Sequence, residues 1–403
     1  MEYSTLAPEL EVSEGGLVYA LGSLYDRFCQ LHDPRKAKGK RYSLVMLVVV
    51  IFLAKLSGRD KPVEIADWAK HRATALVEAL HLTRAWMPHH NTIRRVFQAI
   101  LSEAEFERLL HDYHQSATPD TPAEAVLALD GKALRGGRRG DQEACEYVVS
   151  VYDCQAQRVL VQEVVEAKAN EIGAAPKALA QVNLAGKIVT GDAIHAQRAV
   201  SGYIVAHGGH YLWPLKENHP RVYQDLVRLF APERPLPGCG HLANDFREVR
   251  TVNGGHGRIE IRRLQTSELL NDYLDWPGLG QVYRLERHFS WLRQGQVYKT
   301  SHDVEFGLTS LPRPQASPAR VLAIRRLHWS IETGLHYRRD VTFHEDATRM
   351  TVGPAGRILS VVHDLALGLM KTAGFTNAAQ GRRWFDGHLL EALGLLTGVP
   401  SAS

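Results

Sequence analysis

The sequence has few cysteines, and this scarcity excludes several classes of site. Its 403 residues include four cysteines, and no two of them form a Cys-x-x-Cys pair. A zinc ribbon and a dithiol redox motif both need such pairs, so neither is indicated. The simplest interpretation is that Cys29, Cys145, Cys154 and Cys239 are reduced thiols of a cytoplasmic protein.

Long hydrophobic runs are also missing. The most apolar stretch, residues 44–54 (LVMLVVVIFLA), is too short to span a bilayer and begins too late for a signal peptide. We therefore interpret it as a buried helix and expect no membrane partner. The sequence has no internal repeats or low-complexity tracts, and 45% of its residues are hydrophobic. This composition is typical of a globular protein with two or three domains.

A strong excess of charge is absent, because the net charge is only +4. The basic residues are nevertheless clustered, in residues 33–42, 130–140 and 320–339. A single cluster of this kind is usually a solvated face. Three clusters, two of which contain candidate catalytic acids, favour a polyanionic partner.

The first part of the chain lacks convincing strands. Residues 1–120 alternate helical apolar patterns with breaks at 58–62 and at Pro88, which predicts an all-helical N-terminal domain. Within it, residues 88–100 predict a helix capped by Asn91 or Thr92. We expect this domain to bind DNA ends, and its candidate contacts are Lys40, Arg41, Arg94 and Arg95.

An alternative for the helix in residues 88–100 is an ordinary amphipathic helix. In that case Arg94 and Arg95 are only solvated. Its inward-facing residues would be Ile93, Val96, Phe97 and Ile100.

The pattern changes to β-branched runs near residue 125. Strands are predicted at residues 125–130, 147–153, 158–165, 186–193 and 210–216, with helices at 171–183 and 195–207. Three strands, a helix, a strand, a helix and a strand predict a mixed α/β sheet in the order of the ribonuclease-H-like fold. We expect this catalytic domain to cover residues 121–375, with a β-rich insertion at about 230–310 and a C-terminal tail at 376–403.

Two carboxylates end predicted strands. Asp130 lies in LALDGKALRG and Asp192 in IVTGDAIHAQ, each after an apolar run and before a polar, cationic segment. A single strand-end aspartate is more often a helix cap or a turn former. Because the ends of neighbouring strands meet at one edge of a sheet, two of them favour a metal site.

A third acid lies on the long helix predicted at residues 317–339. Projected at about 100° per residue, the helix places one acid, Glu332, among cationic and aromatic groups. That face comprises Arg325, His328, Trp329, His336 and Arg339, while Arg338 does not fit the scheme. An apolar stripe of Ile324, Leu327, Ile331 and Leu335 lies roughly a quarter-turn away.

Three carboxylates are a suitable ligand set for hard cations, which prefer oxygen. We therefore expect Asp130, Asp192 and Glu332 to bind two Mg²⁺ ions, with Mn²⁺ as a substitute, for phosphodiester chemistry. The expected DNA-backbone contacts beside Asp130 are Lys132, Arg135, Arg138 and Arg139.

Four motif blocks carry a resemblance to a known family. LALDGKALRG, VTGDAIHAQ, LKENHP and HWSIETGLHYRRDVTFHEDATRM resemble those of the H-repeat-associated transposases of bacterial insertion sequences, a branch of the Asp-Asp-Glu transposases. The resemblance covers residues 30 to 375, and its His-Trp-x-Ile-Glu block is specific. It implies that Asp130, Asp192 and Glu332 form the catalytic triad of a ribonuclease-H-like core. It also implies that Lys216 and Asn218 lie near the active edge.

The sequence departs from better-known relatives around the glutamate. Those relatives have Tyr and Arg seven and four residues before the Glu and Lys seven residues after it, where this chain has Arg325, His328 and Arg339. We expect these residues to contact phosphates beside the scissile bond. The remaining DNA-binding candidates are His195 and His336.

The combined prediction is a DNA transposase that recognises terminal inverted repeats, cuts by metal-dependent hydrolysis and joins the 3′ ends to target DNA. We expect double-stranded DNA as the partner, a homodimer or higher oligomer on DNA, and a cytoplasmic, nucleoid-associated location. Alternatives are a catalytically silent DNA-binding derivative and a ribonuclease-H-like nuclease without strand transfer. A histidine metal site is a further alternative, but its candidates lack the close spacing of a zinc site. These candidates are His207, His210, His328, His336 and His344.

Overall fold

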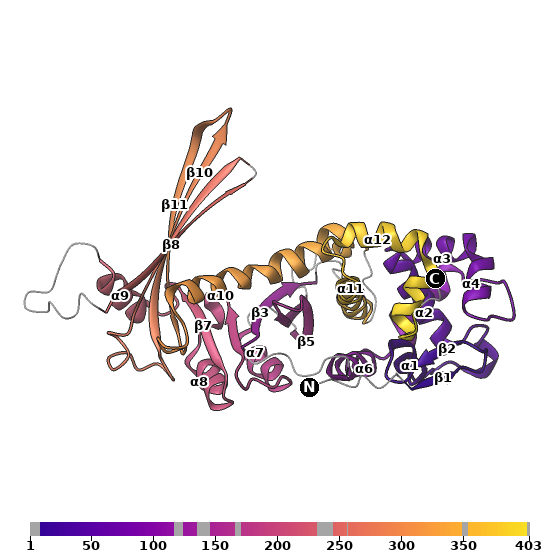
Figure 1. The fold of residues 1–403 in the computed structure, drawn as a ribbon. Coiled ribbons are helices and arrows are strands. Elements are labelled where there is room, and N and C mark those ends of the chain that lie inside the picture. Colours follow the sequence, from indigo (N-terminus) through magenta and orange to yellow (C-terminus); the bar gives the residue numbers. More distant parts are fainter. Residues whose placement is uncertain are drawn as a thin grey trace, which may run out of the picture.

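A nine-stranded mixed sheet organises the protein, as a computed structural model shows for residues 9–116, 124–134, 146–165, 171–231, 245–255, 257–348 and 354–400 (Figure 1). The strand order is β5-β4-β3-β6-β7-β11-β10-β9-β8. Strand β3 pairs in parallel with β6 and antiparallel with β4, and β6 pairs in parallel with β7. The first five strands are β3 (Val126–Ala133), β4 (Tyr147–Asp153), β5 (Arg158–Val165), β6 (Ile188–Gly191) and β7 (His210–Leu215). The predicted mixed α/β sheet is therefore confirmed.

Each face of this sheet is covered by its own apolar core. Side chains alternate along β3, so that Leu127 and Leu129 belong to one core and Val126 and Ala128 to the other. Helices α7 (Glu171–Ala180) and α8 (Arg198–Ala206) cover the first face. Helix α10 (Pro318–Ile331) runs along the opposite face, as Figure 1 shows.

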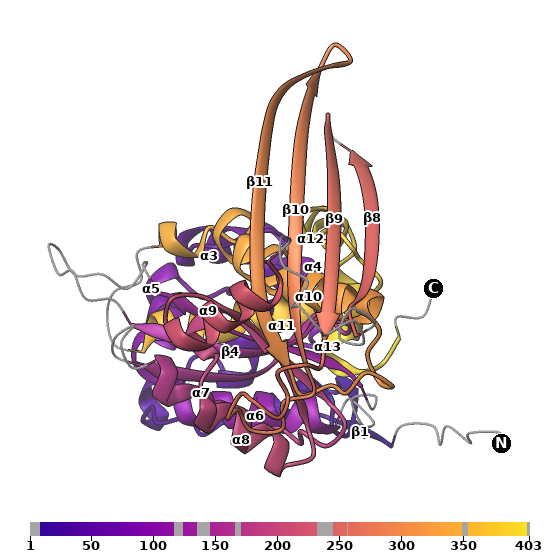
Figure 2. The ribbon, with the colours of Figure 1, turned by 90° about the vertical axis from the view of Figure 1, so that its left-hand side faces the viewer.

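The β-rich segment extends the same sheet. Its strands are β8 (Arg247–Gly255), β9 (Arg258–Ser267), β10 (Gln281–Arg293) and β11 (Gln296–Thr309). They follow helix α9 (Pro220–Leu229), and β11 pairs antiparallel with β7. The far ends of these long strands project away from the rest of the protein (Figure 2).

The N-terminal region contains a short sheet as well as helices, so the expectation of an all-helical domain was wrong. Strands β1 (Leu10–Val12) and β2 (Val18–Ala20) form an antiparallel pair. Three-residue strands are too short to show a recognisable alternation in the sequence. The helical elements are α1 (Leu24–Cys29), η1 (Ala37–Gly39), α2 (Leu44–Leu56), α3 (Pro62–His71), α4 (Ala73–Ala79), α5 (His90–Arg95), η2 (Val96–Ile100) and α6 (Glu103–Ser116).

Two details of these helices bear on the predictions. Helix α2 is the buried helix expected at residues 44–54. Helix α5 is capped by His89, whose side chain accepts from the Asn91 backbone N–H, so the cap predicted at Asn91 or Thr92 was misplaced. Ile93, Val96, Phe97 and Ile100 are buried.

The C-terminal residues do not form a tail. After α11 (Ala355–Thr372), the chain forms α12 (Ala378–Gly387) and α13 (Leu389–Thr397), which lie beside α2 in Figure 1. Phe385 and Leu396 are buried in the same core as Phe28 and Leu53. The C-terminal helices thus complete the N-terminal helical layer, a long-range contact that local patterns do not reveal. Within the described ranges, no helix is long and apolar enough to cross a membrane.

Candidate active site

Strands β3 and β6 bring two aspartates to one edge of the sheet. In their parallel register Leu129 pairs with Gly191, so Asp130 and Asp192 follow the same rung. Neighbouring strands are about 4.8 Å apart, which makes the two backbones direct neighbours. A Cβ on Gly191 would lie 3.0 Å from the Trp213 ring and 3.1 Å from the Leu129 carbonyl oxygen. The position before Asp192 therefore has little room for a side chain.

The third acid reaches this edge from α10. Glu332 directly follows α10 and begins η7 (Glu332–His336), and it is exposed. Ligand atoms of Asp130, Glu332 and His336 all lie within 4.8 Å of one another. His336 Nε2 lies 3.0 Å from Asp130 Oδ2. The fold thus brings together a strand carboxylate and a helix carboxylate that are far apart in the sequence.

The helix changes its winding at Glu332. The segments η7 and η8 (Arg338–Thr342) are π-helical, and Tyr337 N–H donates to the Glu332 carbonyl. A π-helix has i→i+5 bonds and turns less per residue than an α-helix, so an α-helical projection becomes less accurate along it. Beyond Glu332 the projection still places His336 correctly beside Glu332, although His336 is only 5% exposed, but it fails for Arg339, which is fully buried.

Arg325 was expected to meet DNA phosphates, but it is buried in an ion pair. Its Nε donates to Glu305 Oε1 at 2.6 Å and its Nη2 to Glu305 Oε2 at 3.1 Å. The hydroxyl of Tyr283 also donates to Glu305 Oε1. Arg325 therefore ties α10 to β11 instead of facing solvent. Local sequence patterns do not predict this partner. Glu305 lies on β11, 20 residues before Arg325, and the two meet only because the strand packs against the helix.

Arg339 is likewise a structural ion-pair residue, so its expected DNA contact was wrong. It donates to Glu345 over 2.6 to 3.2 Å, and its Nη1 lies 3.7 Å from Asp364 Oδ1. Burial alone would raise the pKa of Glu345, but Arg339 and His363 bring it well below the ordinary value. A fully buried arginine between two acids holds the fold together and has no access to DNA.

His328 lies beside Asp192 and is nearly buried. Its Nε2 is 3.6 Å from Asp192 Oδ1, while 64% of the aspartate side chain remains exposed. Hydrogen bonding from His328 is the main cause that lowers the pKa of Asp192 to about 2, against partial burial and with help from Arg325 and Lys216. Asp192 is therefore a carboxylate at neutral pH.

The LKENHP block lies against the Asp192 loop. Asn218 Nδ2 donates to the Ala193 carbonyl at 2.7 Å, and its Oδ1 accepts from the Lys216 backbone N–H at 3.3 Å. His219 Nε2 lies 2.5 Å from the Ala196 carbonyl oxygen. Lys216 is exposed at this edge. These bonds hold the loop after β6 against the end of β7.

His195 is fully buried, which contradicts its expected DNA contact. Its Nε2 lies 3.4 Å from Glu171 Oε1, behind the aspartates. A Cβ on Gly131 would lie 2.3 Å from that same carboxylate oxygen. Because Gly131 has no side chain, Glu171 can lie next to Asp130. His195 contacts Glu171 and therefore helps to support the site from within the fold.

The remaining basic candidates occupy different surroundings. Lys132 is nearly buried, and its Nζ lies 2.6 Å from Asp340 Oδ1, so it connects β3 to η8 instead of offering a free ammonium. Lys40 is paired with Asp33, and Arg41 lies over the Trp86 ring. Arg94 and Arg95 are exposed. Arg135, Arg138 and Arg139 lie outside the described residues.

Sequence reasoning missed the acids that pair with the basic residues around the site, which are Glu305, Asp340 and Glu345. Asp340 stands eight residues after Glu332, close to the expected cationic face, and this proximity was an available signal. Glu305 offered none, because its role depends on how β11 packs against α10.

A divalent cation fits the donor set at this edge. Asp130 and Glu332 offer carboxylate oxygens, which hard cations prefer, and His336 occupies only one Asp130 oxygen. The Glu332 carboxylate has no hydrogen-bond partner among the described residues. A second group, Glu286, His288 and His302, lies on β10 and β11, where Glu286 already forms an ion pair with Arg284. The first group is therefore the better candidate.

Comparisons with known proteins agree with this geometry. Residues 121–353 match the family model described as "Transposase DDE domain", and residues 25–114 match "DDE_Tnp_1-associated". An "Uncharacterized protein in dhlA 3'region" of Xanthobacter autotrophicus is 33% identical over 63% of this chain and 84% of its own length. The "H repeat-associated putative transposase YhhI" of Escherichia coli K12 is 26% identical, over 87% of this chain and 90% of its own length.

A solved structure is also similar over much of the chain. The cryo-EM structure of a piggyBac transposase synaptic complex with hairpin DNA covers 94% of this chain and 77% of its own, at 9% identity and a TM-score of 0.40.

Proposed function

Because this chain belongs to the transposase DDE domain family, we propose that it cuts DNA at the terminal inverted repeats of its element and joins the 3′ ends to target DNA. The chain is an insertion-sequence transposase. The observation that carries the finer proposal is the meeting of Asp130 and Glu332, with Asp192 on the same rung of the sheet.

The proposed catalytic residues are Asp130, Asp192 and Glu332. Two Mg²⁺ ions, replaceable by Mn²⁺, would supply activation of the attacking oxygen and stabilisation of the leaving oxygen. Asp130 and Glu332 would hold the cation nearest His336. Asp192, ionised and solvent-accessible, would contribute the carboxylate on the neighbouring strand.

Neighbouring residues would hold the carboxylates in position for metal binding. His336 holds one oxygen of Asp130, which leaves the other free to face a ligand. His328 stabilises the ionised form of Asp192, and Asn218 holds the loop that carries it. Lys216 is exposed at the same edge and would meet the DNA backbone.

The strand order supports a ribonuclease-H-like core. Strands β3, β4 and β5 form an antiparallel meander, and β6 and β7 continue from β3 in parallel. The meander precedes two helix-connected strands in the chain, as this fold requires. The partner would be double-stranded DNA, bound by a homodimer or higher oligomer.

Cleavage and joining by the purified full-length protein test the function. The substrate is a linear duplex that carries the inverted repeat found in the DNA flanking the gene, incubated with Mg²⁺. We expect strand cuts at the repeat and joined products from the wild type, and neither from Asp130→Asn, Asp192→Asn or Glu332→Gln. The control is Glu217→Gln, an exposed acid near the site. Full cleavage by Glu332→Gln would overturn the assignment.

A further inference from the structure

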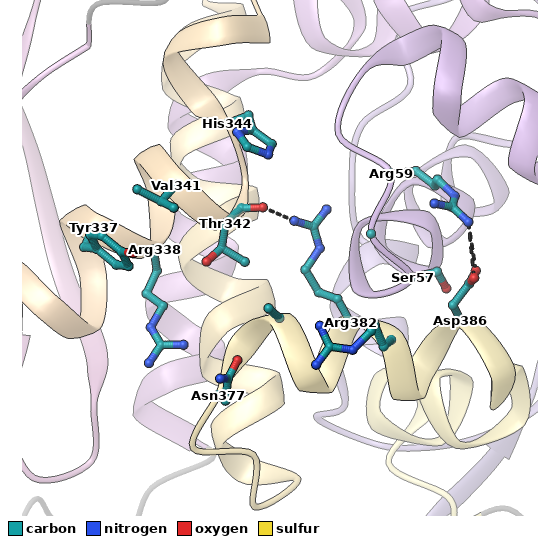
Figure 3. Close-up of a pocket in the computed structure, with 13 residues that line it drawn as sticks. Ser57, Arg59, Tyr337, Arg338, Val341, Thr342, His344, Asn377, Arg382 and Asp386 are labelled. Atoms are coloured by element: carbon teal, nitrogen blue, oxygen red, sulfur yellow. Dashed lines mark hydrogen bonds and ion pairs between the residues drawn. The ribbon is translucent and has the colours of Figure 1, made fainter.

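An open pocket lies beyond the candidate catalytic glutamate on the same helix. It has a volume of about 580 Å³ and is lined by the loop after α2, the π-helical segment η8 and α12 (Figure 3). Four arginines line it: Arg59, Arg338, Arg382 and Arg383. The pocket therefore joins N-terminal and C-terminal helices to the segment that follows Glu332.

The acids of this pocket are outnumbered by their cationic partners. Asp386 accepts from both Arg59 and Arg72, at 3.2 and 2.9 Å. Asp60 accepts from Arg382 at 2.7 Å and lies 3.7 Å from Lys55 Nζ. Each carboxylate thus faces two cations, which leaves an excess of positive charge.

Three further cations have no acidic partner among the described residues. Arg338 Nη2 and Lys371 Nζ both donate to one acceptor, the Thr376 carbonyl, at 3.2 and 3.3 Å. Desolvation first, and Arg338 second, lower the pKa of Lys371. Arg383 is exposed on α12. Two like charges that converge on a neutral carbonyl are stabilised when an anion binds beside them.

An exposed stripe connects the pocket to the active edge. Trp329, Tyr337 and Val341 are 51%, 55% and 48% exposed and recur every four or eight residues along the helix. Arg338 and Thr342 follow Glu332 in the π-helical segments, which rise less per residue than the roughly 1.5 Å of an α-helix, so both lie less than about 15 Å from Glu332 along the helix axis. Because nucleotides of one strand are spaced about 3.4 Å apart along the duplex axis, this separation corresponds to about four nucleotides at most.

We propose that this arginine pocket binds a backbone phosphate of the transposon-end DNA, within about four nucleotides of the phosphodiester that is cut. Arg338 and Arg383, which line the pocket, provide the charge together with Lys371, which shares the Thr376 carbonyl with Arg338. Tyr337 provides an exposed ring beside the path of the strand. The pocket holds the end in register with the carboxylates. This inference rests on the proposed function, because it places the DNA end relative to Asp130 and Glu332.

Binding of the full-length protein to a repeat-containing duplex tests the pocket. Arg338→Gln and Arg383→Gln each should weaken binding about tenfold, as expected for one charge-assisted contact. The slope of affinity against salt should become shallower by about one per variant. The matched control is Lys177→Gln, an exposed lysine on α7 whose loss changes the net charge equally. Thermal melting verifies that the variants remain folded.

A second measurement locates the phosphate. A single neutral methylphosphonate is introduced at successive positions of the repeat duplex. It should weaken wild-type binding at a position within about four nucleotides of the cut and have no further effect there on a double variant that combines Arg338→Gln with Arg383→Gln. If the wild type cuts DNA and both variants bind like Lys177→Gln, the proposed phosphate site is wrong, whereas the proposed function is still supported. A wild type that neither binds nor cuts the duplex overturns both.

Discussion

His336 Nε2 lies 3.0 Å from Asp130 Oδ2, and this contact joins the helix that carries Glu332 to the strand that carries Asp130. His336 is nearly buried, so its ring has a fixed position. The contact fixes one carboxylate oxygen, and the orientation of a metal ligand is set by such partners.

The first prediction follows from this contact. His336→Ala should lower DNA cleavage about 10- to 100-fold, which is the usual effect of losing the partner of a metal ligand. The Mg²⁺ concentration that gives half-maximal cleavage should rise, because Asp130 is no longer oriented. Repeat binding in the absence of metal should stay at the wild-type level. An unchanged Mg²⁺ requirement would mean that His336 only fills space.

The second prediction concerns the ion pair between Arg325 and Glu305. Arg325→Ala should destabilise the protein by about 1.5 to 3 kcal/mol, because the mostly buried Glu305 then loses its two hydrogen bonds from Arg325 and retains Arg287, 3.6 Å away, as its counter-ion. The neighbouring residue Arg326 is exposed, so Arg326→Ala should change stability by about 0.5 kcal/mol or less. Urea unfolding measures both. Equal small losses for the two variants would contradict the structural role of Arg325.

The third prediction concerns the space behind Asp130. Gly131→Ala places a Cβ 2.3 Å from the Glu171 carboxylate, so the variant should lose about 1 to 3 kcal/mol of stability and most of its cleavage activity. Glu171→Ala should partly restore stability when combined with it. Gly173→Ala is the control, because nothing lies within 4 Å of its added Cβ. Thermal melting and cleavage rates together decide whether the clash exists.

The fourth prediction concerns His363 and Asp364, two buried neighbours whose pKa values are shifted in opposite directions. Burial lowers the pKa of His363 to about 4, and burial raises the pKa of Asp364 to about 7. The neutral histidine contributes stability that increases as pH rises from about 4 to its ordinary value near 6.5. The protonated aspartate contributes stability that is lost as pH rises from 3.8 to about 7.

The two contributions should largely cancel between about pH 4.5 and 6 in the wild type. Relative to it, Asp364→Asn should become more stable as pH rises over this interval, and His363→Gln should become less stable. Urea unfolding at several pH values measures these slopes. If the free energy of unfolding depends on pH in the same way in all three proteins, these two groups do not titrate as their burial implies.

The fifth prediction concerns the N-terminal basic helix. Arg94 and Arg95 are exposed, whereas Ile93 and Val96 pack inward, so both the DNA-binding and the merely solvated interpretation remain compatible with α5. If they bind phosphates, Arg94→Ala with Arg95→Ala in the full-length protein should weaken repeat binding and reduce the salt slope by about two, at an unchanged melting temperature. If the double variant binds the repeat as well as Lys177→Gln does, Arg94 and Arg95 do not contact DNA and are only solvated.

Local patterns in the sequence determined the strands and the acids. The runs that became β4 and β5 were predicted at their observed bounds, because runs rich in β-branched residues identify a strand without any partner, whereas β3 extends three residues beyond the predicted 125–130. Asp130 and Asp192 could be paired from sequence, but Asp130 does not end its strand as predicted: β3 continues beside β4 to Ala133, and only its pairing with β6 ends before Asp130. The apolar stripe of α10 was predicted for the same kind of reason, and Ile324 and Ile331 are buried.

The surroundings of the acids were decided only by the tertiary structure. Arg325 and Arg339 have the right spacing for a face shared with Glu332, yet they are buried because Glu305 and Glu345 neutralise them there. Whether a charged side chain meets water or a counter-ion depends on segments that pack together after folding, which helical periodicity does not contain. The same reason explains α12: its Arg382 meets Asp60 near the start of the chain, and only the folded protein places them in contact.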